Sequence, residues 1–293
     1  CLANHPHRLV VNEHNSGSTF RQWDKGIALA KGEFIWIAES DDVAEPTLLE
    51  SLVSALIQQD IAYAYCQSLC INAAGEVFGT IKGWSDHYSP HLWASDFSMD
   101  GNFFCISFMA IKCVIPNASA VLFRREMYLS PFSIMEGFQL IGDYLLWAEM
   151  AMGRRVAFVA RPLNRYRFHA GTVRLAKRRT YFRECIACTT HILARTSAWS
   201  QPSQLVFLRR HLLDLWLTIG LEPASPPNWW TYSRAYGLLY RLHGPMLGPL
   251  LLRAVPRSIR RSLAPTGLFL SLGAASLWRR LRGGGESAAA SRD

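Results

Sequence analysis

The sequence has no uncharged stretch long enough to cross a membrane as a helix. The longest, Ser262–Trp278, has 17 residues and contains Pro265, Gly267 and Gly273, whereas a spanning helix needs about 20 mostly apolar residues. Arginines flank this stretch on both sides, at Arg257, Arg260, Arg261, Arg279, Arg280 and Arg282. Two interpretations stay open: a helix lying at an anionic membrane surface, or a helix packed within the C-terminal region.

The cysteines give no sign of a disulfide framework. There are seven, an odd number, and most lie in apolar runs, where a free thiol packs like a small hydrophobic side chain. Cys185, Cys188 and His191 have the spacing of half a zinc site. Because no second ligand pair follows at a suitable distance, we expect them to pack in a helix. Reduced cysteines indicate a reducing compartment, the cytoplasm.

Acidic residues are scarce in the second half of the chain. Residues 151–293 hold 23 Lys and Arg against 5 Asp and Glu, whereas residues 1–150 hold 8 against 17. An acidic first half suits a cation site, and an Arg-rich second half suits an anionic partner such as phosphate or a phospholipid surface. No recognisable nucleic-acid-binding motif accompanies the arginines, so we expect no nucleic-acid partner. A composition that is 50% hydrophobic and 18% charged excludes a disordered or collagen-like chain.

Strands and helices alternate along the first part of the chain. The spacing of apolar residues predicts a helix from about Phe20 that ends at Gly32, and a second helix over Thr47–Gln59. Phe34–Ala38 and Ile61–Ile71 are apolar runs typical of strands buried on both faces of a sheet. Alternation of this kind predicts an α/β layer architecture.

The rest of the chain divides into three further parts. Residues 72–116 are irregular and suit a long loop over a site. Further elements are expected at Ser119–Phe123, Asp143–Met152, Val156–Ala160 and Leu163–His169. We expect helices from about residue 175 onward and a disordered tail at residues 283–293. We therefore predict domains at residues 1–174, 175–282 and 283–293.

Glu39, Asp41 and Asp42 follow the Phe34–Ala38 strand directly. Open α/β sheets bind ligands at the carboxyl ends of their strands. Three neighbouring carboxylates repel one another unless a cation or a basic partner offsets them, and hard oxygen ligands select Mg²⁺ or Mn²⁺. The alternative is that Asp42 caps the next helix and that the other two acids are solvated.

Three short runs, taken together, resemble the family 2 glycosyltransferases. They are Asn15-Ser16-Gly17, Lys25-Gly26-Ile27 and the run 30–42, which reads AKGEFIWIAESDD. The last run is similar to the family's metal-binding acidic motif. The resemblance covers residues 8–173 and points to members associated with bacterial surface polysaccharides. It implies a GT-A (Rossmann-like) fold with a mostly parallel sheet and helices on both faces, a nucleotide-diphosphate sugar donor, and Mg²⁺ or Mn²⁺.

This resemblance also assigns roles to single residues. Asp41 matches the metal-ligating acid. Glu39 matches the first acid of the motif, which is Asp in most relatives, and Asp42 matches the acid that supports the loop. Glu39 and Asp42, together with Asn15 and Gly17, are expected on the donor side of the site.

Gly142-Asp143-Tyr144 resembles the family position that supplies the catalytic base. An inverting transfer needs one carboxylate near the acceptor hydroxyl to take its proton, and Asp143 is our candidate. The alternative is that Asp143 begins the following helix as its N-cap. Both roles can hold at once.

Arg165, Arg167 and His169 alternate along a strand and point to one face. They resemble a family signature that follows the last core strand. We expect Arg167 to contact the donor diphosphate, and His169 to bind phosphate or to complete the metal shell. The alternative is an edge strand with a solvated basic face. Asn117 and Ser119 also match a family pattern and are expected at the acceptor pocket, although turn chemistry explains them nearly as well.

Family members begin with two strands that end in "P-x-Y-N" and "DD-x-S" runs. Nothing before Leu9 matches these runs, so the resemblance implies a domain that lacks its N-terminal strands. We expect an inverting glycosyltransferase that moves a sugar to a polysaccharide or lipid-linked acceptor, in the cytoplasm at the inner face of the cell membrane. The alternative is a non-catalytic fragment whose Arg-rich helical region binds a membrane surface or a partner protein.

Overall fold

A computed structural model describes residues 5–57, 60–86, 89, 91–128, 135, 137–168, 177–196, 212 and 229–246. The chain forms two compact units, Cys1–Thr196 and Ser197–Asp293. In the second unit the described elements are α10 (Trp229–His243) and a short 3₁₀ turn, η7 (Gly244–Met246). The remaining described elements all belong to the first unit.

Within the described residues, seven strands form one sheet with the order β1-β6-β3-β7-β2, with β4 paired to β3 and β5 paired to β7. The strands are β1 (Phe34–Trp36), β2 (Val43–Ala44), β3 (Ile61–Ile71), β4 (Val77–Thr80), β5 (Phe97–Asp100), β6 (Val121–Arg124) and β7 (Arg155–Arg167). β3 and β7 are the long central strands. They lie in parallel, from Ile61 beside Arg155 to Ile71 beside Arg167.

The sheet is less parallel than the sequence led us to expect. β3 and β7 form the one parallel pair among the described strands, and the other pairings are antiparallel. β1, β3 and β7 still share one direction, because β6 lies antiparallel between β1 and β3. A short apolar run has the same composition whichever way its strand points, so the sequence did not reveal the reversal. The α/β architecture itself is confirmed.

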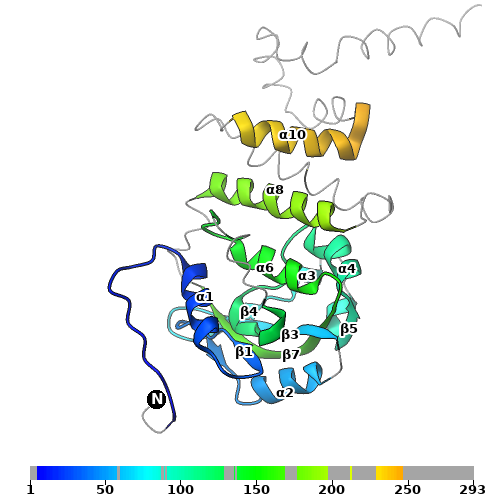
Figure 1. Ribbon diagram of the computed structural model, residues 1–293. Helices are drawn as coiled ribbons and strands as arrows, with labels where there is room; N and C mark the ends of the chain where they lie inside the picture. The colour runs from blue at the N-terminus through cyan, green and yellow to red at the C-terminus, as the bar shows by residue number, and fades with distance from the viewer. Residues whose placement is uncertain are drawn as a thin grey trace, which may run out of the picture. The chain divides into compact units, whose positions relative to one another are not determined.

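Helices cover both faces of this sheet, as expected (Figure 1). The helical elements of the first unit are α1 (Thr19–Leu29), α2 (Leu48–Leu56), α3 (Gly83–Asp86), α4 (Gly101–Phe104), α6 (Gly142–Ala151), α8 (Arg178–Arg195), the 3₁₀ turns η1 (Leu92–Ala94), η3 (Ala118–Ala120) and η4 (Arg125–Met127), and the π-helical turn η2 (Cys105–Met109). On one face, Leu52 and Leu56 of α2 pack against Ala64 and Cys66 of β3. These two β3 residues alternate with Tyr63 and Tyr65, which face the other side.

Aromatic side chains fill the opposite face. The ring of Trp147, in α6, lies 5.8 Å from the rings of Tyr63 and Phe123, between centroids. Trp23 of α1 also packs on Trp147, with a centroid distance of 6.5 Å. α6 and α1 therefore share one aromatic layer above the sheet.

Several element boundaries differ from those expected. The expected strands at Val156–Ala160 and Leu163–His169 are one continuous strand, β7. The first strand ends at Trp36, two residues early, because the chain leaves the sheet to form the acidic loop. Residues 72–116 contain β4, α3, η1, β5, α4 and η2, so this segment is a series of short elements and not one long loop.

α8 packs on α6. Glu149 of α6 pairs with His191 of α8, and Arg195 lies 3.6 Å from the same carboxylate oxygen. The hydrogen bond from His191 lowers the pKa of Glu149, with further lowering from the charges of His191 and Arg195 against an opposing effect of burial. Cys185 and Cys188 are buried in this helix and form no disulfide, in agreement with the packing expected of them.

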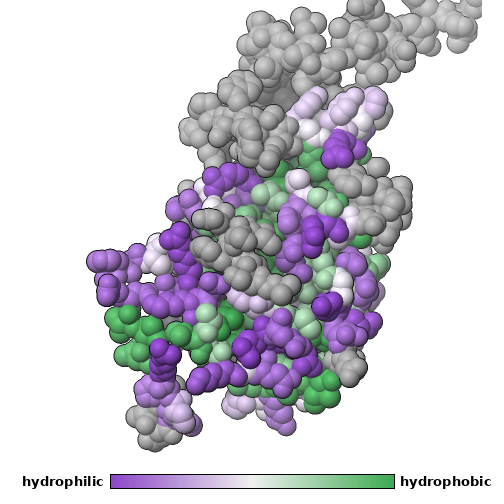
Figure 2. Space-filling view, in the orientation of Figure 1, coloured by the Kyte–Doolittle hydropathy of each residue, from purple (hydrophilic) through white to green (hydrophobic). Residues whose placement is uncertain are grey.

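The face of the described residues drawn in Figure 2 is largely hydrophilic, with apolar patches. Helices expected beyond residue 175 are present as α8 and α10, whereas Ser262–Trp278 and residues 283–293 lie outside the described residues. In the part of the chain that is described, we find no helix both long and apolar enough to span a membrane.

Gly101 provides a test of the packing between α4 and α6. A Cβ atom at this position would lie 1.8 Å from the carbonyl oxygen of Ala151 and 2.8 Å from that of Arg154. Because both neighbours are main-chain atoms, we expect Gly101→Ala to lower the free energy of unfolding by about 2–3 kcal/mol.

The matched control is Gly26→Ala in α1, where the added Cβ meets nothing within 4 Å. There the higher helix propensity of alanine should raise the free energy of unfolding by about 0.5–1 kcal/mol. Chemical denaturation of both variants checks this pair, and equal stabilities would show that the Gly101 contact is not as close as described.

Candidate active site

The acidic loop, Glu39–Asp42, follows β1 at the carboxyl edge of the sheet. One carboxylate oxygen from each of Glu39, Asp41 and Asp42 lies within 4.8 Å of the others. Asp41 is exposed, and the other two are half-buried. Three oxygen ligands at this spacing could bind one divalent cation.

Asp42 is held from two other segments. Its Oδ1 accepts a 2.9 Å hydrogen bond from the backbone N–H of Arg167, and its Oδ2 accepts one from Nδ2 of Asn117. Burial raises the pKa of Asp42, and hydrogen bonds from Arg167, Ser119 and Asn117 partly offset that rise. Asp42 thus anchors the loop to the segments that contain Asn117 and Arg167.

Ser119 fixes the start of the loop. Its Oγ accepts a 3.0 Å hydrogen bond from the backbone N–H of Glu39, and its carbonyl accepts one of 2.8 Å from Nε1 of Trp36. Ser119 and Asn117 are 1% and 3% exposed, so both support the loop here. Their expected contact with an acceptor stays a prediction.

Asn164 is a site residue that the sequence analysis missed. It is completely buried in β7, and its Nδ2 donates to Oδ1 of Asn117 at 3.2 Å and to Oγ of Ser68 at 3.1 Å. These bonds orient the Asn117 amide so that its own NH₂ group faces Asp42. No local pattern in the sequence marks it, because Asn164 lies between Leu163 and Arg165 in a mixed apolar and basic stretch of strand.

Arg167 ties the acidic loop to the β3–β4 hairpin. Its Nε donates to the carbonyl of Asp41 at 2.7 Å, and its Nη1 donates to the carbonyls of Asn72 and Ala73 at 2.8 and 3.1 Å. Two positions earlier, Arg165 pairs with Glu45 at 2.6 Å. The diphosphate contact expected of Arg167 stays a prediction, and His169 lies outside the described residues.

Asn15 and Gly17 form the turn that begins α1. Oδ1 of Asn15 accepts a 2.9 Å hydrogen bond from the N–H of Gly17, which adopts a φ of +66°, a conformation that favours glycine. Ser18 then caps the helix, with its side chain accepting from the N–H of Arg21. This turn lies close to α6, because a Cβ on Gly142 would be 2.6 Å from the Phe20 ring.

Asp143 lies in the first turn of α6 and is 8% exposed. α6 ends at Ala151, and β7 begins four residues later beside Ile61, the first residue of β3. The C-terminal end of α6 is therefore near the amino edge of β3 and β7. Since Trp147, midway along α6, packs on β3 and β6, the helix runs back over the sheet toward the edge that carries the acidic loop.

The structure brings Asp42, Asn117, Ser119, Glu39 and Arg167 into direct contact, and it places Asp143 on a neighbouring helix.

Comparison with known proteins decides the family. The sequence profile of the family described as "Glycosyltransferase like family 2" matches residues 2–200, about two thirds of the chain. The chain belongs to this family. The match extends over α8 as well as the sheet and the acidic loop.

A curated relative agrees over a shorter stretch. The chain is 28% identical over 79 residues to "Uncharacterized glycosyltransferase YibD" of Escherichia coli (strain K12), a stretch that covers 27% of this chain and 23% of that protein. The chain thus matches about a quarter of the relative's length.

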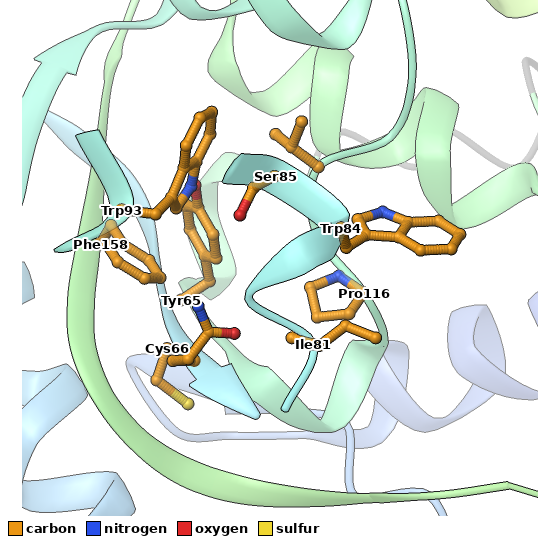
Figure 3. A pocket seen from close by; sticks show the side chains of 10 residues that line it. Tyr65, Cys66, Ile81, Trp84, Ser85, Trp93, Pro116 and Phe158 are labelled. Atoms are coloured by element: carbon orange, nitrogen blue, oxygen red, sulfur yellow. The ribbon is translucent and has the colours of Figure 1, made fainter. Parts of the chain in front are cut away.

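A small aromatic pocket in the first unit is lined by residues of β3 and β7 together with residues 81–85, 93 and 114–116 (Figure 3). In this view Trp93, Tyr65 and Phe158 line one side, and Trp84 and Pro116 line the other. Nε1 of Trp93 donates to the Tyr65 hydroxyl at 2.9 Å. None of the lining residues belongs to the acidic loop, so the pocket is separate from the candidate cation site.

The Arg167 contacts give a testable prediction. Lysine keeps the positive charge but lacks the guanidinium fork that reaches several carbonyls at once, so Arg167→Lys should release the loop from the hairpin turn. We expect a loss of about 1 kcal/mol of stability and faster hydrogen exchange at the amides of residues 41–43.

The matched control is Arg165→Lys, which keeps a single ion pair with Glu45 and should cost less than about 0.5 kcal/mol. Exchange mass spectrometry on both variants makes the measurement. If the loop amides exchange equally in the two variants, Arg167 does not hold the loop.

Proposed function

We propose that this chain is an inverting glycosyltransferase that moves a sugar from a nucleotide-diphosphate donor to a saccharide or lipid-linked acceptor. The observation that carries the proposal is the cluster of three carboxylates, within 4.8 Å of one another, at the strand edge where α/β folds bind ligands, in a domain of glycosyltransferase family 2.

The chemistry of the cluster suits Mg²⁺ or Mn²⁺. All three donors are carboxylate oxygens, the type that these ions prefer. Asp41 is exposed and Glu39 is half-buried, and both match acids of the family's metal-binding motif, so these two residues would hold the ion, with Asp41 the more accessible. A bound ion would supply positive charge to a diphosphate and stabilise it as a leaving group.

The chain's own residues position the donor. The Asn15–Gly17 turn is on the donor side, and Asp42 keeps the loop in shape while Glu39 and Asp41 face the ligand. Arg167 holds the loop through its bond to the Asp41 carbonyl, and Arg167 and His169 contribute positive charge toward the phosphates. The assignments of Asn15, Gly17 and His169 rest on the family motif, and those of Asp42 and Arg167 rest also on the contacts of the loop.

Asp143 is the proposed base. As the acceptor hydroxyl attacks the anomeric carbon, its proton passes to the Asp143 carboxylate, the bond to the diphosphate oxygen breaks, and the nucleoside diphosphate leaves from the opposite face. The position of Asp143 in the first turn of α6 supports this role, because a helix N-terminus favours the charged form of a carboxylate.

The acceptor class is proposed by family resemblance. We propose a growing surface polysaccharide or its lipid-linked precursor in a bacterium, at the inner face of the cell membrane. The competing interpretation is a non-catalytic fragment whose Arg-rich helical region, residues 175–282, binds a membrane surface or a partner protein. It stays a prediction.

The cation site can be tested without a known acceptor. Asp41→Asn removes one ligand charge and should weaken Mn²⁺ binding by about tenfold or more, measured by titration of the paramagnetic Mn²⁺ signal. The control, Asp60→Asn, removes the same charge just before β3, at the opposite edge of the sheet, and should leave Mn²⁺ affinity unchanged. Equal Mn²⁺ affinities of the parent protein, Asp41→Asn and Asp60→Asn would rule out the acidic loop as the cation site.

The base can be tested by turnover. Asp143→Asn keeps the size of the side chain but cannot accept a proton, so the rate of nucleoside diphosphate release from UDP-, GDP- and dTDP-sugars should fall about 10²–10⁴-fold. The donor KM should change little, because Asp143 acts on the acceptor side. A variant with undiminished kcat would exclude Asp143 as the base.

A further inference from the structure

Glu184, on α8, is a buried carboxylate bonded to the segment that leads into α6. It is 2% exposed. Its Oε1 accepts a hydrogen bond of 2.8 Å from the backbone N–H of Gln139, and its Oε2 accepts two of 3.0 Å, from the N–H groups of Leu140 and Ile141. Three consecutive main-chain donors thus converge on one charged side chain.

The start of α6 has no side-chain cap of its own. Its N-cap residue is Ile141, which has no polar atom in its side chain, and no capping bond is made there. The segment before a helix start needs acceptors for its amide groups, and a negative charge near a helix N-terminus is favourable. Glu184 provides both from a different helix, through charge-assisted hydrogen bonds.

Asp143 and Glu184 both act electrostatically on the same thiol of α8, that of Cys188. The pKa of this thiol is raised well above its usual range, first by burial, and further by the neighbouring Cys185 and Cys113 thiols and by the carboxylates of Asp143 and Glu184. One buried thiol on α8 thus responds to both carboxylates. Asp143 and Glu184 therefore belong to the same packed region between α6 and α8.

We propose that Glu184 is a positioning residue for the catalytic base. By fixing residues 139–141, it sets where the first turn of α6 begins and hence where the Asp143 carboxylate lies. The proposal rests on the proposed function of Asp143 as base, and it assigns no contact between Glu184 and the substrate.

If Glu184 only stabilised the fold, its loss would have other consequences than loss of a positioning residue. Glu149, which joins the same two helices, provides the comparison. Glu149, near the other end of α6, also bonds to α8, through His191 and Arg195. If buried or half-buried carboxylates only join α6 to α8, loss of Glu149 and loss of Glu184 should have similar effects. If Glu184 positions the base, its loss should affect turnover selectively.

The experiment compares Glu184→Gln with Glu149→Gln in the full chain. Glutamine at position 184 keeps the size but places an NH₂ donor against backbone donors, so at least one of the three bonds is lost. Displacement of a catalytic group by about 1 Å can cost about 100-fold in rate. We expect kcat for nucleoside diphosphate release to fall about 10–100-fold in Glu184→Gln, with the donor KM within about twofold of the parent value.

Two further measurements separate the possible results. Amide hydrogen exchange at residues 139–141 should rise in Glu184→Gln and stay unchanged in Glu149→Gln. In the Asp143→Asn background, Glu184→Gln should cause little additional loss of kcat, because residues that act as one unit are not additive.

Three results would overturn the proposal: equal losses of kcat in the two Gln variants, unchanged exchange at residues 139–141, or a full additional loss in the Asp143→Asn background. A separate measurement tests the proposed function: undiminished turnover of the single variant Asp143→Asn would exclude Asp143 as the base. That conclusion would not depend on how Glu184 acts on the segment before α6.

Discussion

Mutual repulsion of three carboxylates is the constraint around which this site is built. Glu39, Asp41 and Asp42 present oxygen atoms within 4.8 Å of one another, and such a cluster is stable only if neighbouring groups hold it. The bonds to Asp42 come from neutral donors: a backbone N–H, an amide and a hydroxyl. These donors fix the position of Asp42 without adding positive charge, whereas the charged Arg167 guanidinium binds the loop at the carbonyl of Asp41.

The sheet explains why distant segments can supply these donors. β1, β3 and β7 share one direction, so their carboxyl ends meet at one edge, and residues 39–42, 117–119 and 164–167 come together there. β6 is essential to this arrangement although it runs the other way. Because it is antiparallel, its preceding residues, Asn117 and Ser119, arrive at the edge where β1 ends. A strictly parallel sheet would have placed them at the opposite edge.

The sequence predicted the parts of the site that depend on local patterns. The acids after an apolar run, the Asn15–Gly17 turn and the helix that starts near Asp143 all have short-range signals. Asn164 and Glu184 had none, since a lone polar residue in a strand or helix reveals its importance only through a partner far along the chain. The same limit applies to β6, whose apolar residues Val121–Phe123 predict burial but carry no information about strand direction. Tertiary contacts decide these features.

α8 follows the last strand of the sheet and lies outside the alternation of strands and helices, yet it contacts α6 within the first compact unit. The family match extends to residue 200 and the first compact unit to Thr196, so this helix belongs with the sheet that carries the acidic loop. It contacts α6 at both ends, through Glu184 before the first turn and through His191 near the last. A helix held at both ends cannot slide or tilt without breaking one of these contacts. In the mechanism we propose, α8 therefore fixes the position of the proton acceptor. The three backbone donors and Arg183, 3.6 Å from the carboxylate, offset the cost of burying the charge of Glu184.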